Sequence, residues 1–135
     1  MDLREISKLF YSIKISNQET TSFFEKETGF SLTRYEMMMF IKEKKTCLQS
    51  DIQSELRIDR AAVTRHLKIL EEKNYVKRER NARNNREIFV QITEEALSDL
   101  DHCEKKHNSQ KEPLNISLNS DEAELLANLL NKLIN

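Results

Sequence analysis

Residues 48–70 read LQSDIQSELRIDRAAVTRHLKIL, and their pattern predicts two short helices joined by a tight turn. In the first helix Leu48, Ile52 and Leu56 share one face, because residues four apart lie on the same side of a helix. Residues 57–59 leave room only for a tight turn, and Asp59 is a good N-cap for the helix that follows. Two short helices connected in this way form a helix-turn-helix.

The second helix of the pair, predicted over residues 60–73, has two unlike faces. One face is apolar and carries Val63, Leu67 and Leu70 at helical spacing. The opposite face carries Arg60, Ala61, Thr64, Arg65 and Lys68. Because the major groove of duplex DNA admits one α-helix, we predict that this second face lies in the groove and that Arg65 reads a base. Thr64 and Lys68 are also candidates for phosphate contacts, which position a protein without specifying sequence.

Two extended segments follow, YVKRER at 75–80 and REIFVQI at 86–92, both rich in β-branched and aromatic residues. The residues between them, 81–85, are predicted to form a turn, because Asn tolerates the left-handed backbone conformation. A hairpin directly after a helix-turn-helix is a wing. Its candidate DNA-binding residues are Arg80, Arg83, Asn85 and Arg86. An arginine on a narrow hairpin can enter the minor groove, and Arg86 is the strongest candidate.

The segments before the helix-turn-helix are predicted to be two helices. Apolar residues recur at helical spacing over residues 2–27, and Gly29 follows as a natural stop. A second helix is expected to start at Ser31 or Thr33 and to end near the basic run at 42–45.

Two further helices are predicted after the wing. Thr93 caps a fifth helix, which we expect to run to about Gln110, before Pro113. A sixth helix starts at Ser120 and is rich in leucine. The leucines exceed what one side of a small domain would cover, so this helix is predicted to meet a partner surface.

The composition agrees with a mainly α chain that carries one small β-hairpin wing. The sequence has 135 residues, of which 38% are hydrophobic, and it contains one Gly and one Pro. So few Gly and Pro residues argue against an all-β or a Rossmann-type fold, which need many turns or a Gly-rich loop. The length suits a single hydrophobic core. We therefore predict a single domain over 1–135: a winged helix-turn-helix at about 31–92, with terminal helices at about 1–30 and 93–135.

No apolar run approaches the roughly 20 residues that a membrane-spanning helix needs. The first ten residues, MDLREISKLF, carry charges where a signal peptide would be apolar. We expect a cytoplasmic protein that does not enter a membrane.

The charge of the chain is small in sum but unevenly distributed. The formal net charge of −1 argues by itself against a nucleic-acid-binding protein. However, residues 57–86 contain ten Lys and Arg against four Asp and Glu, whereas the remaining residues contain twelve against nineteen. A basic segment in an acidic chain is an electrostatic footprint for nucleic acid. The predicted partner is double-stranded DNA, and no cofactor is predicted.

Three motifs together resemble the MarR family of bacterial regulators. They are IDRAAVTR at 58–65, LEEKNYV at 70–76 and VQITEEA at 90–96. The order and the lengths of the predicted elements are also similar to those of the family, over essentially the whole chain. Asn74 and Ala96 stand where many members have Gly.

The resemblance implies a recognition helix that begins at Arg60 and a wing arginine at Arg86. That arginine belongs to the Asp-x-Arg signature of the family, which here reads Asn84-Asn85-Arg86. Asn84 removes the charge partner that would orient Arg86. Asn85 stands where many members carry another Arg.

The resemblance also implies a homodimer built from the first and last helices. The residues expected at its interface are Leu3, Ile6, Phe10, Leu126, Leu129, Leu130 and Leu133. Two recognition helices would then lie about one DNA turn, 34–36 Å, apart and bind an imperfect palindrome. Members of the family are usually repressors. Many release DNA on binding small aromatic or anionic effectors, and others sense oxidation through cysteine.

Other interpretations concern the cysteines and the class of protein. Cys47 and Cys103 are candidate redox sensors, although buried structural thiols are the preferred interpretation. Cys103 and His107 are spaced as two zinc ligands on one helix, which is weak evidence, and no metal site is predicted. A protein–protein adaptor on a winged-helix scaffold is the alternative function. No nucleophile with a base and no carboxylate pair indicates an enzyme.

Overall fold

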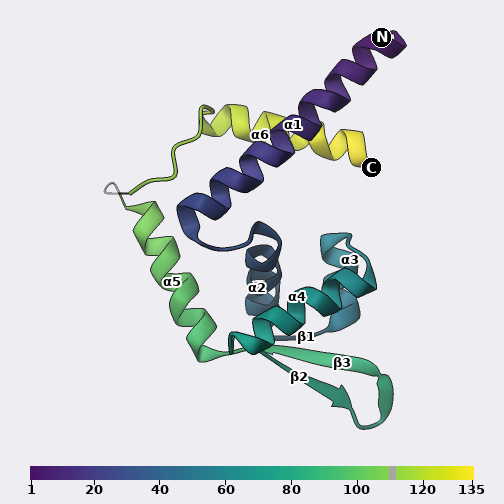
Figure 1. Ribbon diagram of the computed structural model, residues 1–135, viewed down its shortest axis with the longest axis vertical. Helices are drawn as coiled ribbons and strands as arrows, with labels where there is room; N and C mark the ends of the chain where they lie inside the picture. The colour runs from purple at the N-terminus through teal and green to yellow at the C-terminus, as the bar shows by residue number, and fades with distance from the viewer. Residues whose placement is uncertain (110–111) are drawn as a thin grey trace. The chain divides into compact units, whose positions relative to one another are not determined.

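The structure is a computed structural model that describes residues 1–109 and 112–135. The chain divides into two compact units, Met1–Cys103 and Glu104–Asn135 (Figure 1). The first unit contains α1 (Leu3–Thr28), α2 (Leu32–Lys44), β1 (Thr46–Leu48), α3 (Gln49–Leu56), α4 (Arg60–Glu72), β2 (Val76–Asn81), β3 (Asn84–Ile92) and most of α5 (Glu94–Asn108). The second unit contains the end of α5 and α6 (Ser120–Ile134). The described chain is therefore mainly α-helical with one small sheet, as predicted.

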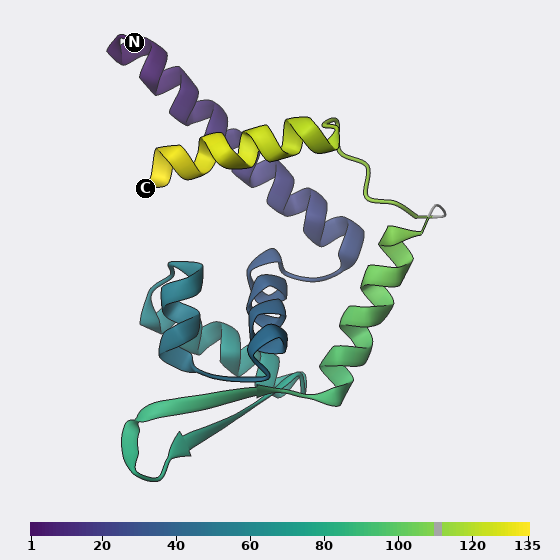
Figure 2. The same cartoon turned by 180° about the vertical axis from the view of Figure 1, so that it is seen from behind.

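An apolar core lies between the sheet and helices α2, α3 and α4. The sheet is antiparallel, with strand order β1-β3-β2. All three helices lie on the same side of it (Figures 1 and 2). Each of these elements contributes fully buried side chains, which include Met37, Met38, Ile41, Ile52, Val63, Leu67, Leu70, Val76 and Val90. Because one core holds them all, the orientation of α4 relative to the β2–β3 hairpin is fixed.

The helix ends follow the capping signals in the sequence. Gly29 ends α1 with φ 77°, and its N–H donates to the Glu25 carbonyl. Ser31, rather than Thr33, is the N-cap of α2, because its hydroxyl accepts from the Arg34 N–H. Asp59 caps α4 as predicted, and its carboxylate accepts from the Ala62 N–H at 2.8 Å. These bonds satisfy amide groups that have no partner within a helix.

Strand β1 was not predicted from the sequence. Cys47 pairs with Val90 and Leu48 with Phe89. Leu48 therefore ends β1 instead of beginning the third helix, which starts at Gln49. A segment of three residues is too short to show a period of two, and only its pairing with β3 makes it a strand.

The hairpin is longer than predicted, and its turn is made differently. β2 and β3 extend to Asn81 and Asn84, so that only residues 82–83 form the turn. None of residues 81–85 has a positive φ, which corrects the expected left-handed asparagines. Instead, the Asn81 side-chain oxygen accepts from the Arg83 N–H at 3.0 Å, and that of Asn84 accepts from the Arg86 N–H at 3.1 Å. Asparagine thus makes the turn through its side chain.

The left-handed asparagine lies at the other end of the hairpin. Asn74 has φ 62° between α4 and β2, which explains why Asn can replace Gly there. Its carbonyl accepts from the Thr93 hydroxyl at 2.8 Å. That hydroxyl also accepts from the Ala96 N–H at 3.1 Å and so caps α5. The Tyr75 hydroxyl donates to Asp99, which joins the start of the hairpin to α5.

Helices α1 and α6 differ from the others because neither contains a buried residue. In α1, Leu3 is 82% exposed and Phe10 is 56% exposed. In α6, Leu129 is 52% exposed and Leu133 is 49% exposed. Within the described residues no helix is both long enough and apolar enough to span a membrane. The predicted end of the fifth helix, Gln110, lies outside the described residues.

Truncation of the core should destabilise the fold strongly. Leu67 on α4 is completely buried, so Leu67→Ala should lower the free energy of unfolding by about 2–5 kcal/mol, through lost apolar contact and a residual cavity. The measurement is urea denaturation followed by circular dichroism. Lys68→Ala on the exposed side of the same helix is the control and should change the free energy by less than about 0.5 kcal/mol. Equal effects of the two changes would contradict the described core.

Candidate nucleic-acid interface

The two faces of α4 are separated as the sequence predicts. Val63 and Leu67 are 0% exposed and Leu70 is 1% exposed. The five side chains predicted to face DNA are all exposed: Arg60, Ala61, Thr64, Arg65 and Lys68. Because α4 is held on one side by the core, its exposed face keeps a fixed direction.

The Thr64 hydroxyl is already bonded within the protein. It donates to the Arg60 carbonyl at 3.0 Å and accepts from the Gln49 side-chain N–H at 2.9 Å. Gln49 begins α3 and is only 9% exposed. Since a hydroxyl has one proton, Thr64 cannot also donate to a phosphate while it keeps the bond to Arg60. This geometry argues against the phosphate contact considered for Thr64.

The four wing residues predicted to contact DNA are exposed, but they are not equivalent. The Arg80 guanidinium donates to the Asn85 carbonyl at 2.8 Å and so braces the end of the hairpin. The Asn84 side chain orders the backbone at Arg86 by accepting its N–H. Asn84, which replaces the Asp of the family signature, therefore still bonds to the backbone of Arg86, but it supplies no negative charge for the guanidinium.

An ion pair that the sequence did not reveal joins the wing to α4. The Arg78 guanidinium donates to the Glu71 carboxylate at 3.1 and 3.3 Å. The hydrogen bond from Arg78 lowers the pKa of Glu71. The spacing of these two residues in the sequence does not indicate that β2 returns beside the end of α4.

A second contact that the sequence did not reveal joins α2 to α4. The Arg34 guanidinium lies 3.3 Å from the Nδ1 of His66. Burial lowers the pKa of His66, and the positive charges of Arg34 and Arg65 lower it further. At neutral pH the imidazole is therefore uncharged and can accept a hydrogen bond from Arg34. His66 thus helps to position α4.

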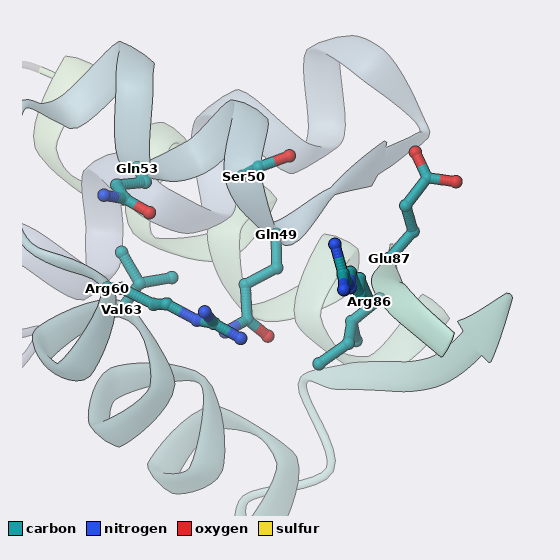
Figure 3. Close-up of a pocket in the computed structure, with 8 residues that line it drawn as sticks. Gln49, Ser50, Gln53, Arg60, Val63, Arg86 and Glu87 are labelled. Carbon is teal, nitrogen blue, oxygen red and sulfur yellow. The ribbon is translucent and has the colours of Figure 1, made fainter. Parts of the chain in front are cut away.

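A cavity of about 530 Å³ lies between α3, α4 and β3. It brings together Arg60, at the start of α4, and Arg86, at the start of β3 (Figure 3). Ser50 and Gln53 of α3 also line it, although the sequence did not single them out. The Gln49 side-chain oxygen is buried beside it without a hydrogen-bond partner. The guanidinium groups of Arg60 and Arg86 can hold an anionic group such as a phosphate, although the Glu87 carboxylate lines the same hollow.

The two cysteines are buried. Burial and the negative charge of Asp51 raise the pKa of Cys47 to about 11. A thiol with so high a pKa is protonated at neutral pH and is a poor nucleophile, which favours the structural interpretation of Cys47. Across residues 1–109 and 112–135, no group of three or more His, Cys, Asp and Glu side chains is arranged to hold a metal ion.

Comparison with known proteins places these features in a family. The sequence profile of the MarR family matches residues 30–88. The chain is 30% identical over 131 residues to YdgJ, an uncharacterized HTH-type transcriptional regulator of Bacillus subtilis strain 168, and the match covers 97% of this chain and 80% of that relative.

Solved structures share the fold over nearly the whole chain. A cysteine-to-serine mutant of MarR from E. coli, in complex with operator DNA, has a TM-score of 0.82 and 23% identity and covers 100% of each chain. BpsR of Bordetella bronchiseptica, whose DNA binding is regulated by 6-hydroxynicotinic acid, has a TM-score of 0.79 and 14% identity, with 95% of this chain and 99% of that chain covered. At these identities the likeness is one of fold.

The His66 contact predicts a dependence of stability on pH. The pKa of His66 in the folded protein lies below its ordinary value of 6.5, so the unfolded chain binds more protons there. The contribution of His66 should therefore be fully present above pH 6.5 and should be lost as the pH falls towards the lowered pKa. Urea denaturation at several pH values should show a steeper loss for the wild type than for His66→Gln. Identical pH profiles for the two proteins would contradict this role.

Proposed function

This chain belongs to the MarR family of DNA-binding transcriptional regulators, and we propose that it is a repressor. It binds an imperfect palindrome as a homodimer and is released from DNA by a small-molecule signal. The observation that supports DNA binding most directly is the exposed basic surface of α4 and the wing. Arg60 and Arg86 are far apart in the sequence but line one hollow. If these arginines were only solvated surface charges, nothing would require the fold to bring them together.

The exposed face of α4 suits the major groove. Arg65 lies there beside Lys68, and small Ala61 allows the helix backbone to approach the bases closely. Arginine can donate two hydrogen bonds to the O6 and N7 acceptors of guanine, which no other base pair presents in the same way. We assign base reading to Arg65 and a phosphate contact to Lys68, whose compact charge is suited to that role.

The hollow between α4 and β3 suits the DNA backbone between two grooves. When a helix lies in the major groove and a hairpin enters the neighbouring minor groove, the phosphate strand that separates them passes between the two elements. We propose that this strand occupies the hollow that Arg60, Arg86 and Ser50 line. In place of the minor-groove contact expected for Arg86, we propose that Arg83, in the turn of the hairpin, enters the minor groove.

Dimerisation is supported by helices that the described chain leaves exposed. In α6 six aliphatic residues are exposed: Leu125, Leu126, Leu129, Leu130, Leu133 and Ile134. In α1 the exposed apolar residues include Leu3 and Phe10. Patches of this kind mark protein–protein contacts, because monomers rarely leave contiguous apolar surface in water. A two-fold dimer would present two copies of α4 about 34–36 Å apart, which matches a palindromic site.

The releasing signal is proposed to be a small aromatic or anionic effector. The support is the structural likeness to BpsR, which responds to 6-hydroxynicotinic acid, a molecule of that class. The high pKa of Cys47, about 11, makes oxidation of that thiol a weaker proposal.

The test is binding of the full chain to the DNA upstream of its own coding sequence, compared with a scrambled duplex of equal length. Affinity is measured as a function of salt concentration by fluorescence anisotropy, and molar mass is measured by light scattering. We expect a dimer that prefers the upstream duplex and loses affinity steeply as salt rises. Equal affinity for both duplexes would contradict the proposal and would favour the protein–protein adaptor.

Two arginine variants should separate base reading from phosphate contact. Arg65→Ala should lower affinity for the upstream duplex by roughly 1–3 kcal/mol and reduce the preference over the scrambled duplex. Arg86→Ala should weaken binding to both duplexes alike and reduce the salt slope by about one unit. The measurement is the same titration, with thermal unfolding as the control for folding. An unaltered preference in Arg65→Ala would reject its assignment to a base.

A charge placed on α6 should dissociate the dimer. Leu129 is 52% exposed, so Leu129→Glu should leave folding intact while placing a carboxylate in the apolar interface. Light scattering at micromolar concentration should give the mass of a monomer, and operator affinity should fall because one half-site alone remains bound. Lys132→Glu, at a charged position of the same helix, is the control. A dimer of unchanged mass in Leu129→Glu would contradict the interface.

A further inference from the structure

The bonds of Thr64 decide which part of its side chain meets DNA. The hydroxyl proton is committed to the Arg60 carbonyl, and the oxygen accepts from the buried Gln49 amide. The bond to Gln49 is partly buried and draws the hydroxyl toward α3. Thr64 is nevertheless an exposed residue. The side-chain group left to face outward is therefore the methyl group.

A second methyl group stands next to it. Ala61 is exposed, and it lies one turn before Thr64 on the same side of α4. Cationic residues, Arg60 and Arg65, are adjacent to these two small residues in the chain. The exposed face of α4 therefore offers two small residues with methyl groups beside its cationic side chains.

We infer that Thr64 is a specificity-determining residue that recognises the C5-methyl group of a thymine in the major groove. Among the four bases only thymine presents a methyl group there, and contact with an apolar side-chain group excludes water from both. Gln49 is the positioning residue, because its amide holds the hydroxyl away from the groove. The inference rests on the proposed insertion of α4 into the major groove, and it names the chemical feature that the helix reads.

Two other contacts of Thr64 are distinguishable from this one. A phosphate oxygen has no proton to donate, so it cannot bond to a hydroxyl whose own proton is in use. The remaining lone pair of the oxygen could accept from the amino group of adenine or cytosine. That contact would depend on the hydroxyl and not on the methyl group.

The experiment compares thymine with deoxyuridine, which differs from it only by the methyl group. The upstream duplex that the protein protects is prepared in a series in which one thymine at a time is replaced by deoxyuridine. Affinities are measured for the wild type and for Thr64→Ser, Thr64→Val and Lys68→Ala. Thr64→Ser keeps the hydroxyl without the methyl group, whereas Thr64→Val keeps a methyl group without the hydroxyl.

The expected result is that the loss of affinity caused by deoxyuridine, here called the penalty, is absent in one variant only. For the wild type, deoxyuridine should weaken binding roughly fourfold at a contacted thymine, the value for one methyl group removed from water. The penalty at that position should disappear in Thr64→Ser and persist in Thr64→Val. Lys68→Ala, the matched control, should bind more weakly overall but retain the penalty. Thermal unfolding shows whether each variant is folded.

Each opposite outcome overturns the inference. Equal penalties in the wild type and Thr64→Ser would mean that another group reads the methyl, and loss of the penalty in Thr64→Val would assign recognition to the hydroxyl. If no replacement affects binding although the unmodified duplex is preferred, the inference fails and the proposed function stands. If the unmodified duplex is not preferred over the scrambled one, both fail together.

Discussion

The apolar stripe of α4 holds the proposed DNA-binding surface in place. Val63, Leu67 and Leu70 pack into a core to which α2, α3 and the sheet all contribute. Burial of such side chains contributes roughly 1.5–3 kcal/mol each, which is enough to fix the rotation of the helix about its axis. With one side buried, the opposite side faces outward with a defined set of groups. The direction of the proposed recognition face therefore depends on apolar side chains that lie in the core and are not exposed themselves.

Polar contacts further restrain the orientation of α4 that packing in the core establishes. The Arg34–His66 contact joins α2 to α4, the Arg78–Glu71 ion pair joins α4 to the wing, and the Gln49–Thr64 bond joins α3 to α4. None of these is a strong bond, since a partly exposed ion pair such as Arg78–Glu71 contributes at most about 1 kcal/mol and a typical hydrogen bond contributes about 0.5–1.5 kcal/mol. Their effect is on orientation, because each restrains α4 against a different neighbour.

Charge distribution matters more for this chain than net charge. The sum is −1, yet the helix-turn-helix and wing concentrate ten basic residues against four acidic ones. Two of these basic residues make contacts within the folded protein, since Arg78 is paired with Glu71 and Arg80 donates to the Asn85 carbonyl. The acidic remainder of the chain repels the DNA backbone and so favours approach through the basic face.

The sequence by itself determined the helices, the caps at Asp59 and Thr93, the hairpin and the split between the two faces of α4. These features depend on residues close together in the chain, where helical spacing and capping operate. Only the tertiary structure decided the pairing of β1, the turn geometry of the wing and the bond between Gln49 and Thr64. Each of those depends on the path of the folded chain or on backbone angles that residue types do not fix. Periodicity can predict which side of a helix faces outward, but only packing decides which atoms of that side remain exposed.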